Sequence, residues 1–301
     1  MRLKRWASTA SIAVATVLII AKVMAFWVTN SVSLLSSLMD SAFDVLASGL
    51  TMLSIIHAAT PADEDHRFGH GKLEALGALG QSIFITGASL FLLVESVRRL
   101  IKPEIMHEAP IGIAVMMLSL VLTAALVLFQ RHVIRKTQSV AIAADGLNYK
   151  GDLLTNAGVI LALVLSHYTS WQYFDPLFAL VVALVLLRNA YGILRDSADI
   201  LMDKELPDAD RKRIETLVTC HPDVESIHDL RTRSTGERIF IEFHLEMDGD
   251  MTLDRAHDIT EELECILYAA YPKAEIMMHQ EPAGIDDHRL DHSIAQAEKT
   301  K

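Results

Sequence analysis

The chain has 301 residues, of which 51% are apolar, and a mean hydropathy of +0.30. Its net charge is −11 and it has no basic patch interleaved with aromatic residues, which argues against a nucleic-acid partner. Long apolar runs fill residues 1–204, residues 205–284 resemble a soluble domain, and 285–301 read as a disordered tail. We therefore expect a membrane domain followed by a soluble domain that buries its own core.

Six apolar segments are long enough to cross a bilayer, because a spanning helix needs about 20 mostly apolar residues. They are predicted at about 6–28, 32–58, 73–97, 110–131, 139–167 and 173–196. The first segment is longer than the apolar region of a secretory signal, so we interpret it as a membrane helix. Lys22, near the end of this segment, is expected to reach the membrane surface.

Six crossings place both chain ends on the same side of the membrane. That side carries more basic residues than the other, and the positive-inside rule identifies it as the cytoplasm. The basic residues on this side are Arg2, Lys4, Arg5, Arg67, Lys72, Arg131, Arg135 and Lys136, against Arg98, Arg99 and Lys102 opposite.

Carboxylates lie inside two of the predicted spans, where charged side chains are costly and usually line a polar path. The second span carries Asp40 and Asp44. The fifth carries Asn148 and Asp152, with Asp145 on about the same face as Asn148. Residues four apart lie above one another on a helix, so each pair forms a ridge of oxygen atoms that suits a divalent cation. A single membrane aspartate could form a hydrogen bond between helices instead, but two pairs favour a metal site.

The loop between the second and third spans reads PADEDHRFGHGK over residues 61–72. Asp63, His66 and His70 are spaced so that this loop could hold one ion with nitrogen and oxygen ligands, as Zn²⁺ or Fe²⁺ accepts. For this fragment alone, a solvated acidic loop is nearly as good an interpretation. Its position beside a charged membrane path favours the metal site.

The soluble domain is predicted to be an α+β fold with the order α-β-β-α-β, at 207–219, 224–233, 238–247, 252–271 and 274–280. Alternation over 239–245 places His244 on the wetter face of a strand, and His279 and Glu281 share one face of the last strand. His228 and His257 lie in the first strand and the second helix. These four histidines and one carboxylate could converge on a metal, although scattered histidines are more often surface residues.

Five segments, in this order, resemble the cation diffusion facilitator family, most closely its bacterial zinc/iron efflux branch. They are NSVSLLSSLMDSAFD at 30–44, PADEDHRFGHGKLEAL at 61–76, ADGLNYKGDLLTN at 144–156, HDLRTR at 228–233 and MHQEP at 278–282. The resemblance runs from about residue 8 to 282. Several independent matches in the same order make it specific.

The resemblance implies a homodimer in the bacterial inner membrane that exchanges metal cations for protons and is not an enzyme. Each protomer would have a six-helix transmembrane domain and a ferredoxin-like cytoplasmic domain. The implied site residues are Asp40, Asp44, Asn148 and Asp152 for transport, Asp63, His66 and His70 in the loop, and His228, His244, His257, His279 and Glu281 in dimer-bridging cytoplasmic sites. A salt bridge between Lys72 and Asp203 is also implied.

Two positions depart from the pattern of this branch. Glu281 stands where close relatives have Asp, which preserves the ligand chemistry, and Asn148 stands where zinc-transporting relatives have His. An oxygen-only site leans towards Mn²⁺ or Fe²⁺ relative to Zn²⁺, with Cd²⁺ as a further candidate. Because Asn148 cannot titrate, the proton carriers are expected to be Asp40, Asp44 and Asp152.

Two other functions fit the sequence less well than transport. A membrane-anchored metal sensor would not need carboxylate pairs deep in two spans. An intramembrane metallohydrolase would need an activated nucleophile or an open metal position, and the sequence has no HExxH or GxSxG motif.

Overall fold

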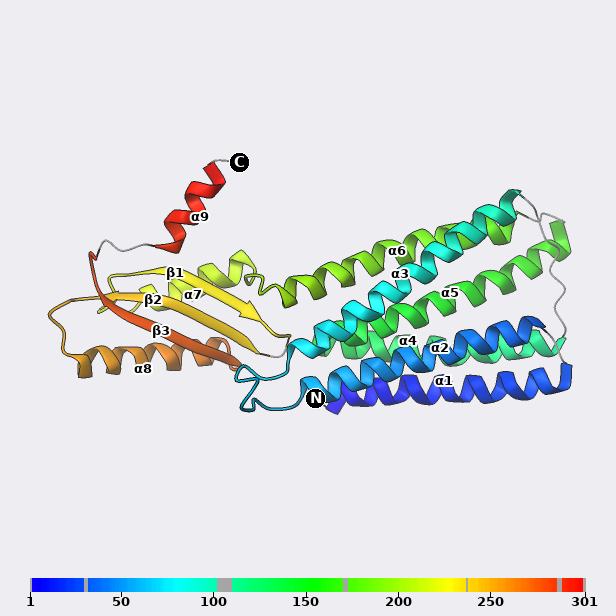
Figure 1. Ribbon diagram of the computed structural model, residues 1–301, viewed down its shortest axis with the longest axis horizontal. Coiled ribbons are helices and arrows are strands. Elements are labelled where there is room, and N and C mark those ends of the chain that lie inside the picture. Colours follow the sequence, from blue (N-terminus) through cyan, green and yellow to red (C-terminus); the bar gives the residue numbers. More distant parts are fainter. Residues whose placement is uncertain are drawn as a thin grey trace. The chain divides into compact units, whose positions relative to one another are not determined.

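The computed structural model describes residues 2–29, 32–101, 110–169, 173–236, 238–285 and 289–299. The chain folds into two compact units, Met1–Ala198 and Asp199–Lys301. Figure 1 shows a helical bundle in the first unit and a small sheet with helices in the second.

The helical unit is built from six long helices. They are α1 (Arg2–Thr29), α2 (Val32–Ala58), α3 (Lys72–Ile101), α4 (Pro110–Thr137), α5 (Val140–Thr169) and α6 (Phe174–Leu201). Among the described residues, five are long and apolar enough to cross a membrane, namely α1, α2, α3, α4 and α6. Helix α5 has the length, 30 residues, but its first half carries Asp145, Lys150 and Asp152. The predicted helical membrane domain is confirmed.

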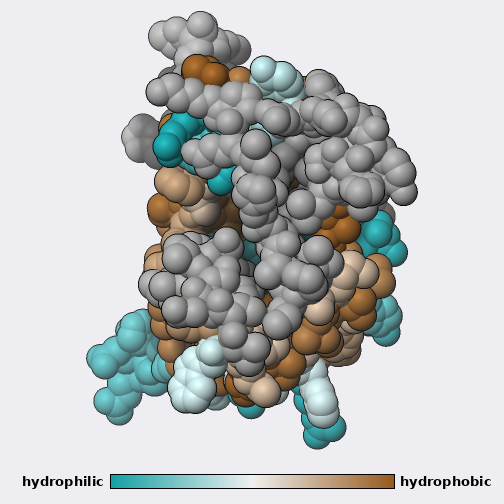
Figure 2. All heavy atoms as spheres, turned by 90° about the vertical axis from the view of Figure 1, so that its right-hand side faces the viewer, coloured by the Kyte–Doolittle hydropathy of each residue, from teal (hydrophilic) through white to brown (hydrophobic). Residues whose placement is uncertain are grey.

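The surface of this bundle is apolar, as expected for helices that face lipid. Large side chains such as Trp27, Phe91 and Leu128 are 85%, 73% and 66% exposed. Figure 2 shows hydrophobic side chains over much of the described surface on the side that it presents. Polar residues are instead buried between the helices, which is the reverse of a soluble bundle and fits a protein with several membrane spans.

Buried polar contacts also join the helices at the end of the bundle where α1, α3 and α5 begin. Lys4 of α1 donates to Glu74 of α3 at 2.6 Å, and both side chains are buried. Ser139, just before α5, also donates to Glu74. Next to this network Gly77 lets α3 approach α2, because a Cβ atom there would collide with Ser54.

The C-terminal unit has the predicted order α-β-β-α-β. Its elements are α7 (Asp208–Thr219), β1 (Ser226–Ser234), β2 (Ile239–Met247), α8 (Leu253–Ala270) and β3 (Ala274–Pro282). The sheet order is β1-β2-β3, with β1 antiparallel and β3 parallel to β2. One face of β2 packs on both helices, and the core contains Ile214, Val218, Ile241, Phe243, Leu245, Ile259, Leu263 and Leu267. Since strand side chains alternate, His244 lies on the other face.

The tail expected to be disordered from residue 285 contains a helix, α9 (Leu290–Lys299), so that prediction is corrected. Its first turn is capped by Asp229 of β1, whose carboxylate accepts hydrogen bonds from the backbone N–H groups of Leu290 at 2.8 Å and Asp291 at 2.9 Å. The Asp291 carboxylate accepts one in return from the N–H of Asp229, at 2.8 Å. Arg289 adds an ion pair with Glu246 at 2.5 Å.

Candidate metal sites

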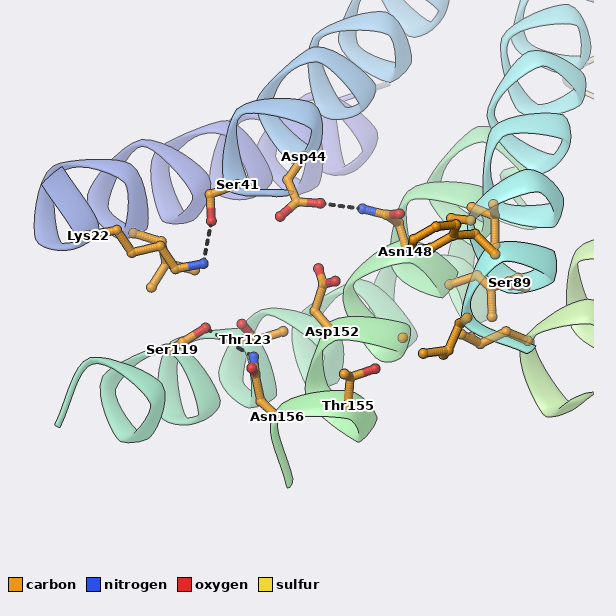
Figure 3. Close-up of a pocket in the computed structure, with 18 residues that line it drawn as sticks. Lys22, Ser41, Asp44, Ser89, Ser119, Thr123, Asn148, Asp152, Thr155 and Asn156 are labelled. Atoms are coloured by element: carbon orange, nitrogen blue, oxygen red, sulfur yellow. Dashed lines mark hydrogen bonds between the residues drawn. The ribbon is translucent and has the colours of Figure 1, made fainter. Parts of the chain in front are cut away.

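Three of the four predicted transport residues face one cavity inside the helical unit. Asp44 comes from α2, and Asn148 and Asp152 come from α5. The amide nitrogen of Asn148 donates a hydrogen bond to a carboxylate oxygen of Asp44 at 2.8 Å (Figure 3). The cavity has a volume of about 320 Å³. The side chain of Asp40 lies outside the described part of the structure, so its place in the site stays a prediction.

The walls of the cavity mix oxygen-bearing and apolar side chains from all six helices. Ser89 of α3, Ser119 and Thr123 of α4, and Thr155 and Asn156 of α5 supply hydroxyl and amide groups. Apolar residues, such as Leu18, Leu147 and Leu186, close the remaining surface. Liquid water occupies about 30 Å³ per molecule, so the space can hold an ion together with some of its hydration shell. Oxygen atoms of this kind suit hard and borderline divalent cations.

Lys22 also borders this cavity, which sequence reasoning missed. It is only 7% exposed, and its ammonium donates a hydrogen bond to the hydroxyl of Ser41 at 2.7 Å. The expectation that Lys22 reaches the membrane surface is therefore wrong. Its position in the sequence resembles a helix end, but the packing of α1 against α2 encloses the side chain. A lysine inside a predicted span was the available signal.

Asp145 lies on the same face of α5 as Asn148 and Asp152, but its role is structural. It is fully buried and accepts hydrogen bonds from four other helices. The donors are Ser11 of α1 at 2.6 Å, Ser48 of α2 at 2.8 Å, Gln130 of α4 at 2.8 Å and Gln81 of α3 at 3.5 Å. Asp145 is not among the described residues that line the cavity. It holds five helices together next to the site.

The predicted loop ligands lie close together between α2 and α3. One oxygen of Asp63 is 3.3 Å from His66 Nδ1 and the other is 3.3 Å from His70 Nε2. The backbone N–H of His66 donates to Asp63 and lowers the pKa of this carboxyl, which keeps it ionised. Gly69 has a φ of +78°, a conformation that bends the chain between the two histidines. One ligand atom from each residue lies within 4.8 Å of the others.

In the C-terminal unit the sheet register brings three histidines into a row. His228 pairs with His244 across β1 and β2, and His244 pairs with His279 across β2 and β3. Neighbouring rings in the row are 4.8 Å apart between centroids. Glu281 approaches two of them, with its oxygens 3.1 Å from His228 Nε2 and 3.2 Å from His244 Nδ1.

This cluster fits a bound metal ion. His228 is buried, yet within the described residues neither of its ring nitrogens makes a hydrogen bond, and neither does Glu281 Oε1. Buried polar atoms without partners are rare in folded proteins, whereas metal ligands have this arrangement. Two imidazoles and a carboxylate are ligands that Zn²⁺ or Fe²⁺ accepts. His228, His244 and Glu281 would hold such an ion, which would link all three strands.

The remaining predicted residues are not gathered into these sites. His257 lies on α8, which packs on the opposite face of the sheet, and its ring is 3.5 Å from Glu261. Lys72 belongs to the helical unit and Asp203 to the C-terminal unit, so their salt bridge stays a prediction. Sequence reasoning also missed Glu246, 3.9 Å from His228. Hydrogen bonds from Ser226 and Arg289 lower the pKa of Glu246.

Comparison with known proteins gives matches along nearly the whole chain. Residues 8–202 match the family model of the cation efflux transmembrane domain, and 206–283 match that of the cation efflux protein cytoplasmic domain. The chain is 42% identical over 284 residues to cation-efflux pump FieF of Klebsiella pneumoniae subsp. pneumoniae and to that of Salmonella choleraesuis, covering 94% of each chain in both cases.

A solved structure, the metal-bound C-terminal domain of the CzcD transporter from Thermotoga maritima, is 26% identical with a TM-score of 0.26. It covers 27% of this chain and 100% of its own. The two family models and the FieF relatives cover both units that the structure describes. This multi-pass membrane protein is therefore a cation-efflux transporter and belongs to the cation diffusion facilitator family.

Proposed function

We propose that the protein exports divalent transition-metal ions from the cytoplasm across the bacterial inner membrane, in exchange for protons. The observation that carries this proposal is the convergence of Asp44, Asn148 and Asp152 on one cavity inside a bundle of membrane-spanning helices. Carboxylates are costly in a membrane, and here they face a space that can hold an ion. The similarity to FieF cation-efflux pumps supports the same function.

Proton coupling follows from the ligand chemistry of the cavity. Carboxylates bind a metal ion only when they are deprotonated, so release of the metal favours uptake of protons. Asn148 cannot titrate, which leaves Asp40, Asp44 and Asp152 as carriers. The amide nitrogen of Asn148 already donates to Asp44, so its amide oxygen is the atom available to the ion.

The cargo proposed for this site is Fe²⁺ or Mn²⁺ in preference to Zn²⁺. Imidazole nitrogen favours zinc, whereas carboxylate and carbonyl oxygens suit harder ions. With Asn148 in place of a histidine, the metal ligands offered by the described residues that line the cavity are oxygen atoms. Zinc can still bind through oxygen, and Cd²⁺ is a further candidate, so the expected result is a changed order of preference.

The other two clusters are proposed to bind metal on the cytoplasmic side, where both termini also lie. The loop site of Asp63, His66 and His70 precedes α3 and is accessible to solvent. The cytoplasmic residues His228, His244, His279 and Glu281 are proposed to contribute to sites that bridge a homodimer, to which the partner would contribute His257. A dimer explains how a residue on α8 could join a site on the opposite face of the sheet.

The test is metal transport by the purified protein in liposomes, with Zn²⁺, Fe²⁺, Mn²⁺ and Cd²⁺ compared. Asp152→Asn keeps the size of the side chain but removes its charge, and it is expected to abolish the flux of every ion. Asn148→His is expected to move zinc up the order. Normal flux in Asp152→Asn would refute the site, an unchanged order in Asn148→His would refute the cargo, and flux that ignores an imposed pH gradient would refute proton coupling.

A further inference from the structure

A positively charged side chain lies in the wall of a cavity that is proposed to carry cations. Lys22 of α1 is 7% exposed, and its ammonium is held by the hydroxyl of Ser41 on α2 at 2.7 Å. Figure 3 shows Lys22 and Ser41 on the same side of the cavity as Asp44. Ser41 and Asp44 are three residues apart on α2, so they share one face of that helix.

Burying an ammonium in a membrane protein is costly, so a lysine at this position calls for negative charge nearby. Nearby negative charge offsets that cost, and the cavity supplies it through Asp44 and Asp152.

We propose that Lys22 is a tethered counter-ion of the transport cavity and tunes its affinity for metal. In the absence of metal, its ammonium balances part of the charge of Asp44 and Asp152. When a divalent cation enters, the ion shares the cavity with a positive charge that cannot leave. Repulsion between the two lowers the affinity for metal and favours its release. This inference rests on the proposed transport function.

A tethered positive charge affects both the affinity for metal and the rate of turnover. Removal of the ammonium leaves the carboxylates with the metal alone, so the ion binds more tightly and leaves more slowly. Lys22→Met replaces the ammonium with an uncharged side chain of similar length. We expect the KM for metal to fall by about tenfold or more, because a like charge in a medium of low dielectric is removed. We expect kcat to fall as well, because release is slower.

The experiment is Mn²⁺ and Zn²⁺ transport by the full chain in liposomes, with KM and kcat measured separately. Lys22→Arg keeps the charge and is expected to bring KM back towards the wild-type value. Lys150→Met is the matched control, since Lys150 lies on α5, is exposed and is not among the residues that line the cavity. It removes a lysine from the same bundle and is expected to leave KM unchanged.

An unchanged or higher KM in Lys22→Met would overturn the inference, provided that the variant elutes as a folded protein. If Lys22→Met does not fold, Lys22→Gln tests the same loss of charge with a polar side chain. An equal change of KM in Lys22→Arg and Lys22→Met would also overturn it, because shape and not charge would then be responsible. Absence of flux in the wild type, or full flux in Asp152→Asn, would refute the transport function itself.

Discussion

Two carboxylates on α5, about two turns apart, show how the same residue type serves two purposes in one bundle. Asp145 is fully buried, and each of its oxygens accepts hydrogen bonds from two protein donors. Asp152 borders the cavity together with Asp44 and Asn148. Burial of an acid in the membrane therefore does not by itself identify a metal ligand. The distinction lies in whether the side chain also borders a space that can hold an ion.

The C-terminal unit repeats this contrast between neighbouring groups. Asp229 is 5% exposed and its two oxygens accept hydrogen bonds from the start of α9. The adjacent His228 and the nearby Glu281 have buried atoms without a hydrogen bond in the described part of the chain. In both units a carboxylate engaged by the protein lies beside a group of side chains suited to bind a cation.

The largest loss of stability should come from removing Asp145, the carboxylate of the helical unit that accepts hydrogen bonds from four other helices. Asp145→Ala is expected to lower the free energy of unfolding by about 2–4 kcal/mol, because four buried donors lose their acceptor. Asp152→Ala, at the wall of an existing cavity, should lower the free energy of unfolding by less than this while it abolishes metal flux. Thermal unfolding of the detergent-solubilised protein, followed by size-exclusion chromatography, measures the first effect. A stable Asp145→Ala protein without flux would instead place Asp145 in the ion pathway.

The sequence predicted which residues share a face of a helix, but not what they meet there. Asp145 and Asp152 have the same angular position on α5, so helical spacing cannot separate them. Their difference arises from Ser11, Ser48 and Gln130, which come from three other helices far away in the chain.

The sequence also did not predict how deeply a side chain is buried. Lys22 lies close enough to the end of a span to suggest the membrane surface, and only the packing of α1 and α2 shows it enclosed. Helix α9 was missed because its cap, Asp229, lies in a different element. Asp229 has a φ of +52° at an irregularity of β1, where the strand register shifts between His228 and Arg231. By contrast, alternation correctly placed His244 on the face of β2 that lies away from the core, and His279 and Glu281 on one face of β3.

A smaller effect on stability is expected from metal binding to His228, His244 and Glu281 in the C-terminal unit. Zn²⁺ at one hundred times its dissociation constant should stabilise the strands by about 2.7 kcal/mol, because it binds only the folded arrangement. Hydrogen exchange of residues 226–247 and 274–282 in the full chain, with zinc and with a chelator, measures this. Glu281→Ala should remove the protection by zinc. Glu275→Ala is the matched control, an exposed carboxylate at the same side-chain parity of β3.

If zinc protects these strands equally in Glu281→Ala and in the wild type, the cluster is not the binding site. Loss of protection in Glu275→Ala would show that general surface charge, and not the row of histidines, attracts the ion. Either result would mean that His228 and Glu281 do not differ from Asp229 by binding a metal ion.

The smallest loss of stability is expected when Asp229, which caps α9, is replaced. Asp229→Ala removes both hydrogen bonds to the first turn of α9, and loss of a helix cap costs about 1 kcal/mol. The positive φ of this residue adds a smaller strain, because Asp tolerates this backbone conformation better than Ala does. Hydrogen exchange should show faster exchange in residues 290–299. Asp291→Ala, which loses only the reciprocal bond, separates the loss of contact from the strain and should give the smaller change.

Zinc protection of the strands should survive in both variants, since Asp229 engages α9 and the cluster consists of His228, His244 and Glu281. Arg289 remains paired with Glu246 in either case, so α9 is loosened at its start and still tethered to β2. If Asp229→Ala abolishes zinc protection while Asp291→Ala does not, the backbone conformation at Asp229 is what positions His228. Asp229 would then help to build the metal site. The structural and metal-binding roles, which belong to different residues of α5, would be combined in β1.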